Sequence, residues 1–182
     1  IFMFMERAYN FAKENRALGL GVLGLHSLFQ SKMLPFASFE AGTLNQTIFK
    51  TIQERSIVAT KELAIKFGEP KVMKGTGRRN STLLAVAPTT SSAFILGQVS
   101  QSIEPTFSNS YVKDVAKLKT TIKNKYLEQI LKERGKDTRE TWVDIQNHDG
   151  SVQHLTYLTD NEREVFKTFP EINQYEIINQ AS

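Results

Sequence analysis

Four consecutive hydroxyl side chains, TTSS at positions 89–92, form the most chemically suggestive stretch of this 182-residue chain. They follow Pro88, which ends the short apolar run STLLAVA (81–87), and they precede AFIL, which can begin a helix. The free N–H groups and the positive dipole end of a first helical turn attract anions, and small hydroxyls add hydrogen bonds. A strand, a hydroxyl loop and a helix start therefore predict a phosphate-binding loop. Its hydroxyl residues are Thr89, Thr90, Ser91 and Ser92, and Ala93 begins the helix that follows.

The same residue types also fit a purely structural role, because Ser and Thr are common helix caps. A P-loop is excluded, since that motif needs a Gly-rich loop and a Lys, and no Lys lies between Arg79 and Lys113. From spacing alone, phosphate binding and helix capping both remain open.

A G-x-G-x-x-G pattern within residues 18–25 raises the possibility of a nicotinamide-dependent dehydrogenase, with Glu40 as the acid that binds ribose. That fingerprint needs a strand before it, but residues 6–15 have the apolar spacing of a helix. Glu40 lies in a Pro- and Ser-containing stretch and does not end an apolar strand. We therefore predict a strand at 18–25 whose small residues allow close backbone packing. The three glycines are Gly19, Gly21 and Gly24.

Composition narrows the possible chemistry further. The chain has no cysteine, which excludes disulfides, thiolate metal sites and thiol chemistry by this chain alone. His26, His148 and His154 are scattered in sequence, which predicts packing or surface roles and no metal site. The charge of +4, from 23 basic and 19 acidic residues, suits a phosphate ligand but shows no basic block typical of nucleic-acid binding.

No run reaches the roughly 18 apolar residues of a membrane span, and the first residues lack the features of a signal peptide. We therefore expect a cytoplasmic chain with no membrane or nucleic-acid partner. The chain begins with Ile1, and its last helical pattern, from Ile172 to Ala181, is still continuing at the end. This predicts a fragment, or one piece of a divided polypeptide.

Helical periodicity dominates the rest of the chain. Apolar residues repeat at helical spacing from Leu44 to Leu63, and Gly68 follows as a stop signal. Two shorter helices are expected in 124–135 and 137–150, and Thr159 with Glu162 has the spacing of a capping box. Two strands among these helices indicate an α/β fold with a helix-rich C-terminal third.

Three strings in order along the chain carry a resemblance to a known family. They are GLGVLGLHSLF (19–29), the run from RRNSTLLAVAPTTSS to SIEPTFSNSYVKD (78–114), and GSVQHL (150–155). Together they resemble the large, catalytic alpha subunit of class I ribonucleotide reductase. The resemblance implies an oxidoreductase that reduces ribonucleoside diphosphates by radical chemistry, for deoxyribonucleotide and DNA synthesis. It also implies a ten-stranded α/β barrel, of which residues 1–182 would be a single partial domain, the C-terminal half.

The resemblance assigns roles residue by residue. The loop Thr89–Ala93 would bind the substrate diphosphate, while no residue of this chain would be catalytic, because the radical and reducing cysteines of the family lie outside the matched segment. The segment alone would bind no cofactor or metal and would be inactive. The whole enzyme implies the remaining alpha subunit, an alpha homodimer, a radical-generating dimetal beta subunit, ATP and dNTP effectors, and a thioredoxin- or glutaredoxin-type reductant.

Two departures from the family pattern accompany the resemblance. The interval from Pro88 to Pro105 is one residue longer than in animal-type members, and the link from Gly68 to Arg78 is much shorter. Neither changes the hydroxyl loop. A non-enzymatic phosphate-binding module and a fragment of a nicotinamide-dependent dehydrogenase remain as alternative functions.

Overall fold

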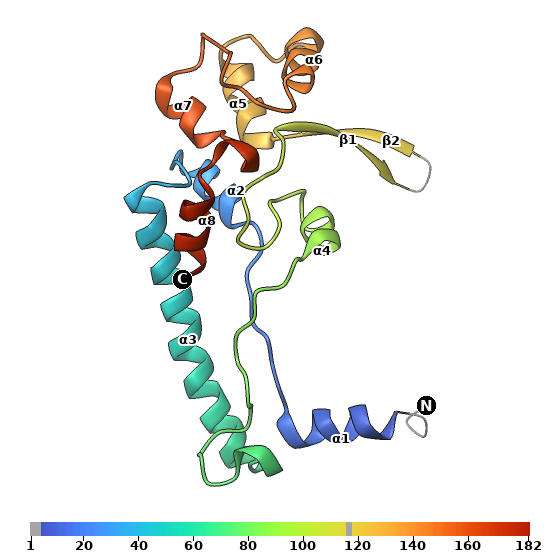
Figure 1. The fold of residues 1–182 in the computed structure, drawn as a ribbon, viewed down its shortest axis with the longest axis vertical. Helices are drawn as coiled ribbons and strands as arrows, with labels where there is room; N and C mark the ends of the chain where they lie inside the picture. Colours follow the sequence, from blue (N-terminus) through green and yellow to red (C-terminus); the bar gives the residue numbers. More distant parts are fainter. Residues whose placement is uncertain (1–4, 116–117) are drawn as a thin grey trace. The chain divides into compact units, whose positions relative to one another are not determined.

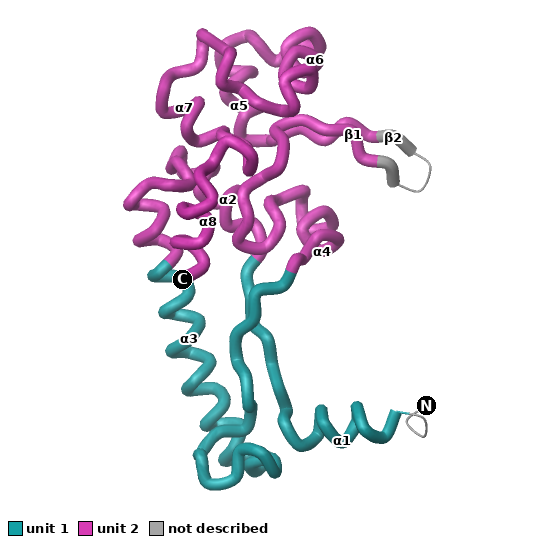
Figure 2. Tube along the Cα trace, viewed as in Figure 1, with its two compact units in different colours: residues 1–22, 46–87 teal, residues 23–45, 88–182 magenta. Residues whose placement is uncertain are grey.

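The chain forms two compact units in a computed structural model that describes residues 5–115 and 118–182 (Figures 1 and 2). The first unit comprises residues up to 22 together with 46–87, and the second comprises 23–45 together with 88–182. The first unit contains α1 (Glu6–Asn15), most of α3 (Phe39–Phe67) and the 3-10 turn η2 (Lys71–Met73). The second contains α2 (Leu25–Ser31), α4 (Thr90–Ile95), β1 (Ser110–Val115), β2 (Leu118–Lys123), α5 (Lys125–Glu133), α6 (Arg139–Asn147), α7 (Asp160–Val165), the 3-10 turn η3 (Phe169–Glu171) and α8 (Gln174–Ala181).

Helix α3 confirms the long helix expected from apolar periodicity and extends it at both ends. The hydroxyl of Ser38 accepts a hydrogen bond from the Ala41 amide at 3.1 Å and so satisfies a free donor at the helix start. Gly68 adopts a left-handed conformation (φ 76°) and ends the helix, as the sequence predicts. Helix α1 occupies the predicted range 6–15.

The glycine-rich segment and the run before Pro88 lie side by side as extended, parallel chains. Leu20 donates its amide to the Leu83 carbonyl at 2.8 Å and accepts from the Ala85 amide at 3.0 Å, which produces a parallel bridge between Leu20 and Leu84. The predicted strands are thus paired, although a single bridge is formed here. The expected burial of 81–87 is wrong for this chain, because Val86 is 64% exposed and no further strand covers the pair within the described residues.

Close backbone approach explains two of the glycines. A Cβ atom on Gly21 would collide with the carbonyl oxygen of Ala85, and one on Gly19 would lie 2.7 Å from the Ala85 side chain. This confirms the prediction of close packing and excludes a branched side chain at either position. Gly24 differs, since its positive φ of 80° turns the chain into α2.

Polar side chains fasten this extended pair to α3. The buried hydroxyl of Thr60, on α3, donates to Asn80 Oδ1 at 2.8 Å, and Asn80 Nδ2 donates to the Arg16 carbonyl at 2.7 Å. The Arg79 guanidinium donates to the carbonyls of Phe67 and Gly68, which are free acceptors at the end of α3. The Arg-Asn sequence therefore joins the helix end to both extended segments.

The second unit has its apolar core around α5, α6 and α7. The predicted capping box of Thr159 with Glu162 is present. Asn124, for which no cap was predicted, caps α5 by accepting from the amides of Tyr126 and Leu127. The antiparallel hairpin β1–β2 and the short helix α2 were not expected from the sequence. The core residues are Leu127, Leu131, Trp142, Ile145, Val152, Leu155, Leu158, Val165 and Phe166.

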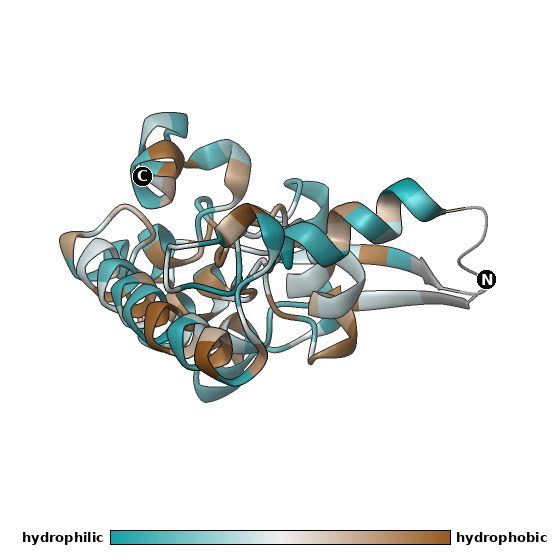
Figure 3. Cartoon of the chain, turned by 90° about the horizontal axis from the view of Figure 1, so that it is seen from below, coloured by the Kyte–Doolittle hydropathy of each residue, from teal (hydrophilic) through white to brown (hydrophobic). Residues whose placement is uncertain are grey.

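Several apolar side chains remain at the surface. Ile65 is 88% exposed and Phe39 is 85% exposed, both on α3. Figure 3 shows brown, hydrophobic segments alternating with teal, hydrophilic ones along the helices. Among the helices of the described part, none combines the length and apolar character that a membrane span requires.

We predict that Gly21→Ala lowers the free energy of unfolding by about 1–3 kcal/mol, because the new methyl group must displace the Ala85 backbone. Gly42→Ala is the matched control, since its Cβ would meet no atom closer than 4.0 Å and alanine favours a helix by about 0.5–1 kcal/mol. Urea denaturation of the two variants measures the difference. Equal effects would contradict the close-approach explanation.

Candidate functional site

The hydroxyl loop leads into α4 and turns sharply at its first residue. Thr89 has a left-handed φ of 52°, and its hydroxyl accepts a hydrogen bond from the Ser102 amide at 2.8 Å. The Thr90 hydroxyl donates to Gln101 Oε1 at 2.9 Å. These two hydroxyls therefore attach the loop to residues 101–102, and no side chain caps α4. The structure thus disfavours helix capping as the role of these residues.

The remaining donors of the loop are open. Ser91 and Ser92 are exposed, and their hydroxyls have no hydrogen-bond partner in the described part of the chain. The amides of Thr90, Ser91 and Ser92 belong to the first turn of α4 and have no carbonyl partner there either. The amide of Ala93 differs, because it donates to the Thr89 carbonyl at 2.8 Å. The small side chain of Ala93 is 1% exposed, so it packs α4 against the rest of the unit.

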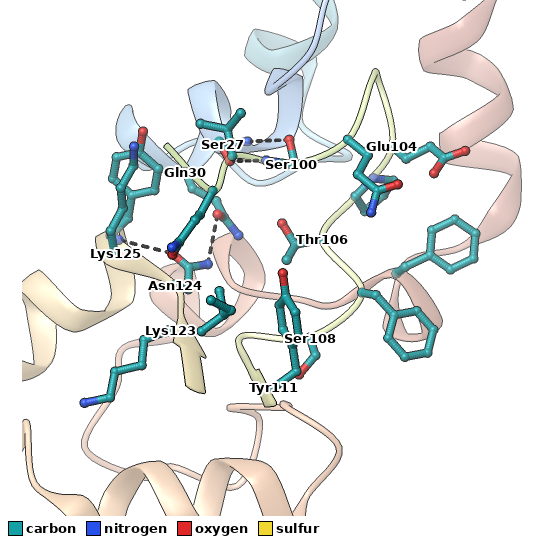
Figure 4. A pocket seen from close by; sticks show the side chains of 18 of the residues that line it. Ser27, Gln30, Ser100, Glu104, Thr106, Ser108, Tyr111, Lys123, Asn124 and Lys125 are labelled. Carbon is teal, nitrogen blue, oxygen red and sulfur yellow. Dashed lines mark hydrogen bonds between the residues drawn. The ribbon is translucent and has the colours of Figure 1, made fainter. Parts of the chain in front are cut away.

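A pocket of about 650 Å³ opens beside this loop, within the second unit. Thr90 lines one side, and the hairpin and the start of α5 contribute Tyr111, Lys123 and Asn124 (Figure 4). Glu104, within the SIEP string, also lines it. Ser91 and Ser92 do not, so the pocket and the open donors meet only at Thr90.

Charge and protonation at the pocket favour an anion. Lys113 lies with its ammonium 4.0 Å from the centre of the Phe94 ring, and Lys123 lies 4.7 Å from that of Trp142. These cation–π contacts hold two ammonium groups on the pocket wall, of which that of Lys123 is also paired with the Asp137 carboxylate at 3.8 Å. Burial raises the pKa of the Tyr111 phenol above its ordinary value, so this hydroxyl stays protonated and can donate a hydrogen bond.

A buried amide network includes two residues of the pocket lining, Gln30 and Asn124. Asn109, 2% exposed, donates through Nδ2 to the carbonyls of Gly150 at 2.9 Å and Phe166 at 2.7 Å. Its Oδ1 accepts from Asn124 Nδ2 at 2.8 Å, and Asn124 also donates to Gln30 Oε1 at 3.0 Å (Figure 4 shows the Asn124–Gln30 pair). Asn109, within the SIEPTFSNSYVKD string, thus has a structural role beside the pocket.

His26 confirms the packing role expected for it. The side chain is fully buried, Nδ1 accepts the Thr106 amide at 2.8 Å, and the ring meets Phe36 edge-on with centroids 5.3 Å apart. Burial lowers the pKa of His26 from 6.5 to about 4, despite the opposing effect of the Val165 carbonyl. The imidazole is therefore neutral at physiological pH and leaves Nδ1 free to accept.

The other two histidines correct the sequence interpretation. His148 and His154 were expected to be scattered, but their rings stack with centroids 3.7 Å apart, and both contact the Asp144 carboxylate. The sequence indicates half of this cluster, because Asp144 and His148 are four residues apart at the end of a helix and so share one helix face. The position of His154 depends on the loop that follows α6.

Comparisons with known proteins define the family. The family model described as ribonucleotide reductase, barrel domain, matches residues 2–76 and 70–182, so the chain belongs to this family and forms part of its barrel domain. The ribonucleoside-diphosphate reductase large subunit of Invertebrate iridescent virus 3 is 42% identical over 181 residues, covering 98% of this chain and 29% of that protein. The zebrafish (Danio rerio) large subunit is 33% identical over 210 residues, covering 98% and 26%.

A solved structure agrees with these relatives. The class Id ribonucleotide reductase alpha subunit of Actinobacillus ureae matches with a TM-score of 0.90 and 54% identity, covering 98% of this chain and 32% of that one. The chain thus spans about a third or less of the length of these relatives. The family resemblance inferred from the sequence is confirmed, and the comparisons give no support to the dehydrogenase or the non-enzymatic module.

We expect Asn109→Asp to lower the free energy of unfolding by about 2–5 kcal/mol, because a buried carboxylate would then face the Gly150 and Phe166 carbonyls without donors. The same substitution at exposed Asn161, in the first turn of α7, should change stability by no more than about 0.5 kcal/mol, since negative charge suits a helix start. Chemical denaturation distinguishes the two, and an Asn109→Asp protein of normal stability would contradict the network.

His26 predicts a defined pH dependence of stability. Its folded pKa of about 4 lies below the unfolded value near 6.5, so the unfolded chain takes up the proton first as the pH falls. Its contribution is complete above about pH 6.5 and is lost progressively down to about pH 4, by roughly 3 kcal/mol. His26→Asn retains an acceptor for the Thr106 amide and removes the titration. As the pH falls from 6.5 to 4, the unfolding free energy of the wild type should decrease toward that of His26→Asn. Parallel curves for the two proteins would show that His26 is not the group that titrates.

Proposed function

We propose that this chain is part of the large subunit of a class I ribonucleoside-diphosphate reductase and that the loop Thr89–Ala93 binds the diphosphate of the substrate. The family and the names of the relatives support the activity. The observation that carries the binding assignment is the group of open donors at the start of α4. Three amides and two hydroxyls there lack partners within the described residues.

This donor arrangement suits a phosphate chemically. The amides of Thr90, Ser91 and Ser92 lie at the positive end of α4, where an anion is stabilised, and the Ser91 and Ser92 hydroxyls can donate two more hydrogen bonds. Thr89 and Thr90 act differently, since their hydroxyls already bond to Ser102 and Gln101 and hold the loop in place. We therefore assign direct phosphate contact to the serines and positioning to the threonines.

The diphosphate is assigned to the loop itself and not to the 650 Å³ pocket beside it, because the open serines do not line that pocket. Lys113 and Lys125 line the pocket and have no carboxylate partner in the described part of the chain, so they add a positive field that raises the local concentration of an anionic substrate. The base and ribose of the substrate would then be held by residues of the remaining alpha subunit.

The reaction also requires chemistry that this chain does not carry. Reduction of a ribonucleotide by a radical needs a thiyl group and reducing thiols, and the chain has no cysteine. We assign these groups to other parts of the alpha subunit, the radical to a dimetal beta subunit, and regulation to ATP and dNTP effectors. A thioredoxin- or glutaredoxin-type reductant, an alpha homodimer and a cytoplasmic location complete the proposal.

The test is the double variant Ser91→Ala/Ser92→Ala in the complete alpha subunit assayed with its beta subunit. We expect the substrate KM to rise by about 5- to 150-fold, equivalent to about 1–3 kcal/mol, the scale of hydrogen bonds to a charged group. Binding should not vanish, because the backbone amides remain.

Ser31→Ala provides the matched control. Its exposed hydroxyl donates to the Leu28 carbonyl of its own helix and touches no part of the loop, so the KM should stay unchanged. Substrate affinity equal to wild type in the double variant would refute the diphosphate assignment while leaving the family unaffected.

A further inference from the structure

A cluster of one carboxylate and two imidazoles lies at the end of α6. None of its residues belongs to the hydroxyl loop or lines the 650 Å³ pocket. His154 Nε2 lies 2.9 Å from Asp144 Oδ2, and His148 Nδ1 lies 3.4 Å from Asp144 Oδ1. One ligand-type atom from each residue falls within 4.8 Å of the other two. The proposed reductase chemistry uses none of these residues.

The backbone holds the three residues in place. Asp144 and His148 lie one turn apart, and their neighbour Ile145 is fully buried in the core. The chain then reverses at Gly150, which has a positive φ of 82°. The Gly150 amide donates a hydrogen bond to the Ile145 carbonyl and so closes the end of α6. His154 follows between Val152 and Leu155, both buried, so its Cα is fixed by core packing.

The side chains themselves remain accessible. Their exposed fractions are 47% for Asp144, 48% for His148 and 27% for His154. Two neutral imidazoles can stack and still present a lone pair, whereas two charged rings at this separation would repel each other. The Asp144 carboxylate supplies the negative charge that a dication needs. His148 Nδ1 also lies 2.9 Å from the Asp144 backbone carbonyl, so His148 would bind an ion through Nε2 or after this hydrogen bond is released. The cluster therefore combines a preorganised backbone with exposed side chains that can turn toward an ion.

We propose that Asp144, His148 and His154 form a binding site for one divalent transition-metal ion of the zinc type. Imidazole nitrogen with carboxylate oxygen is a ligand set for zinc, nickel or cobalt, whereas magnesium and calcium prefer oxygen alone. Zinc–ligand distances near 2.1 Å place the ligand atoms of a tetrahedral site about 3.3 Å apart. The candidate ligand atoms here lie within 4.8 Å of one another, so rotation of the exposed side chains must bring them closer by about an ångström to complete the site. Water fills the remaining positions.

An ion in this site would cross-link α6 to the loop containing His154. Asp144 lies in the last turn of α6 and His148 is its C-cap, while His154 belongs to the segment between Gly150 and α7. Because only the folded chain brings these residues together, bound metal should raise the melting temperature. The site is thus structural in its effect and independent of substrate binding.

The test is calorimetric titration of the chain with Zn²⁺ alone at about pH 7.5, together with thermal melts. We expect one ion per chain with a Kd in the micromolar range and a higher Tm with Zn²⁺. His148→Ala and His154→Ala should each weaken binding at least tenfold, with folding checked by circular dichroism. A millimolar excess of Mg²⁺ should not compete.

Asp149→Asn is the control, because this exposed carboxylate lies next to His148 in sequence but is not part of the cluster. Its zinc affinity should equal that of the wild type. The proposal is overturned if the folded chain shows no saturable Zn²⁺ binding, if both histidine variants bind as tightly as wild type, or if Mg²⁺ displaces the ion.

Discussion

The side chain of Asn109 supplies the interaction on which the second unit depends. One buried amide contacts the turn after α6 at Gly150, the end of α7 at Phe166 and the cap of α5 at Asn124. Asn124 also donates to Gln30, and the Gly150 carbonyl also accepts the Asn109 backbone amide at 3.3 Å. The Phe166 carbonyl has no other donor among the described residues, so without the Asn109 side chain it would be unsatisfied, at a cost of about 1–3 kcal/mol. The hairpin, the pocket wall and the helices behind it are therefore fixed by the same group.

The network also links the pocket to the proposed zinc site through the protein interior. Gly150 accepts the Asn109 side chain and also forms the turn that carries the chain from α6 toward His154. A Cβ atom at this glycine would collide with the Ser108 side chain, next to Asn109. The same turn therefore needs glycine for two reasons, its positive φ and the lack of space.

Sequence reasoning succeeded where the signal is local. Helical periodicity, the Gly68 stop and the Thr159–Glu162 capping box each depend on residues a few positions apart, and all are present. The glycine-rich segment was also interpreted correctly as a site of close backbone approach. The hydroxyl loop was located as a strand-to-helix turn, but the bonds of Thr89 and Thr90 to residues 101–102 are tertiary and have no periodic signature.

The failures share a physical cause. The hairpin β1–β2 lacks the Asn-Gly or Asp-Gly turn that marks such a motif, so its pairing was not visible in the sequence. The clustering of His148 with His154 depends on the chain reversal at Gly150, and six-residue spacing alone does not imply contact. Burial of 81–87 was overestimated because an apolar run shows which residues avoid water and does not supply the surface that covers them.

The parallel pairing of Leu18–Leu20 with Thr82–Ala85 has a kinetic consequence. Thr82 donates to the Leu18 carbonyl across 64 residues of sequence, so folding of this unit must close a long loop before the pair gains any hydrogen bond. Such non-local contacts slow folding, whereas helix formation is a microsecond event. Helix α3, which lies within that loop, forms from local contacts and holds Thr60 ready to bond Asn80. The strand pairing therefore depends on contacts distant in sequence, whereas α3 needs none of them to form.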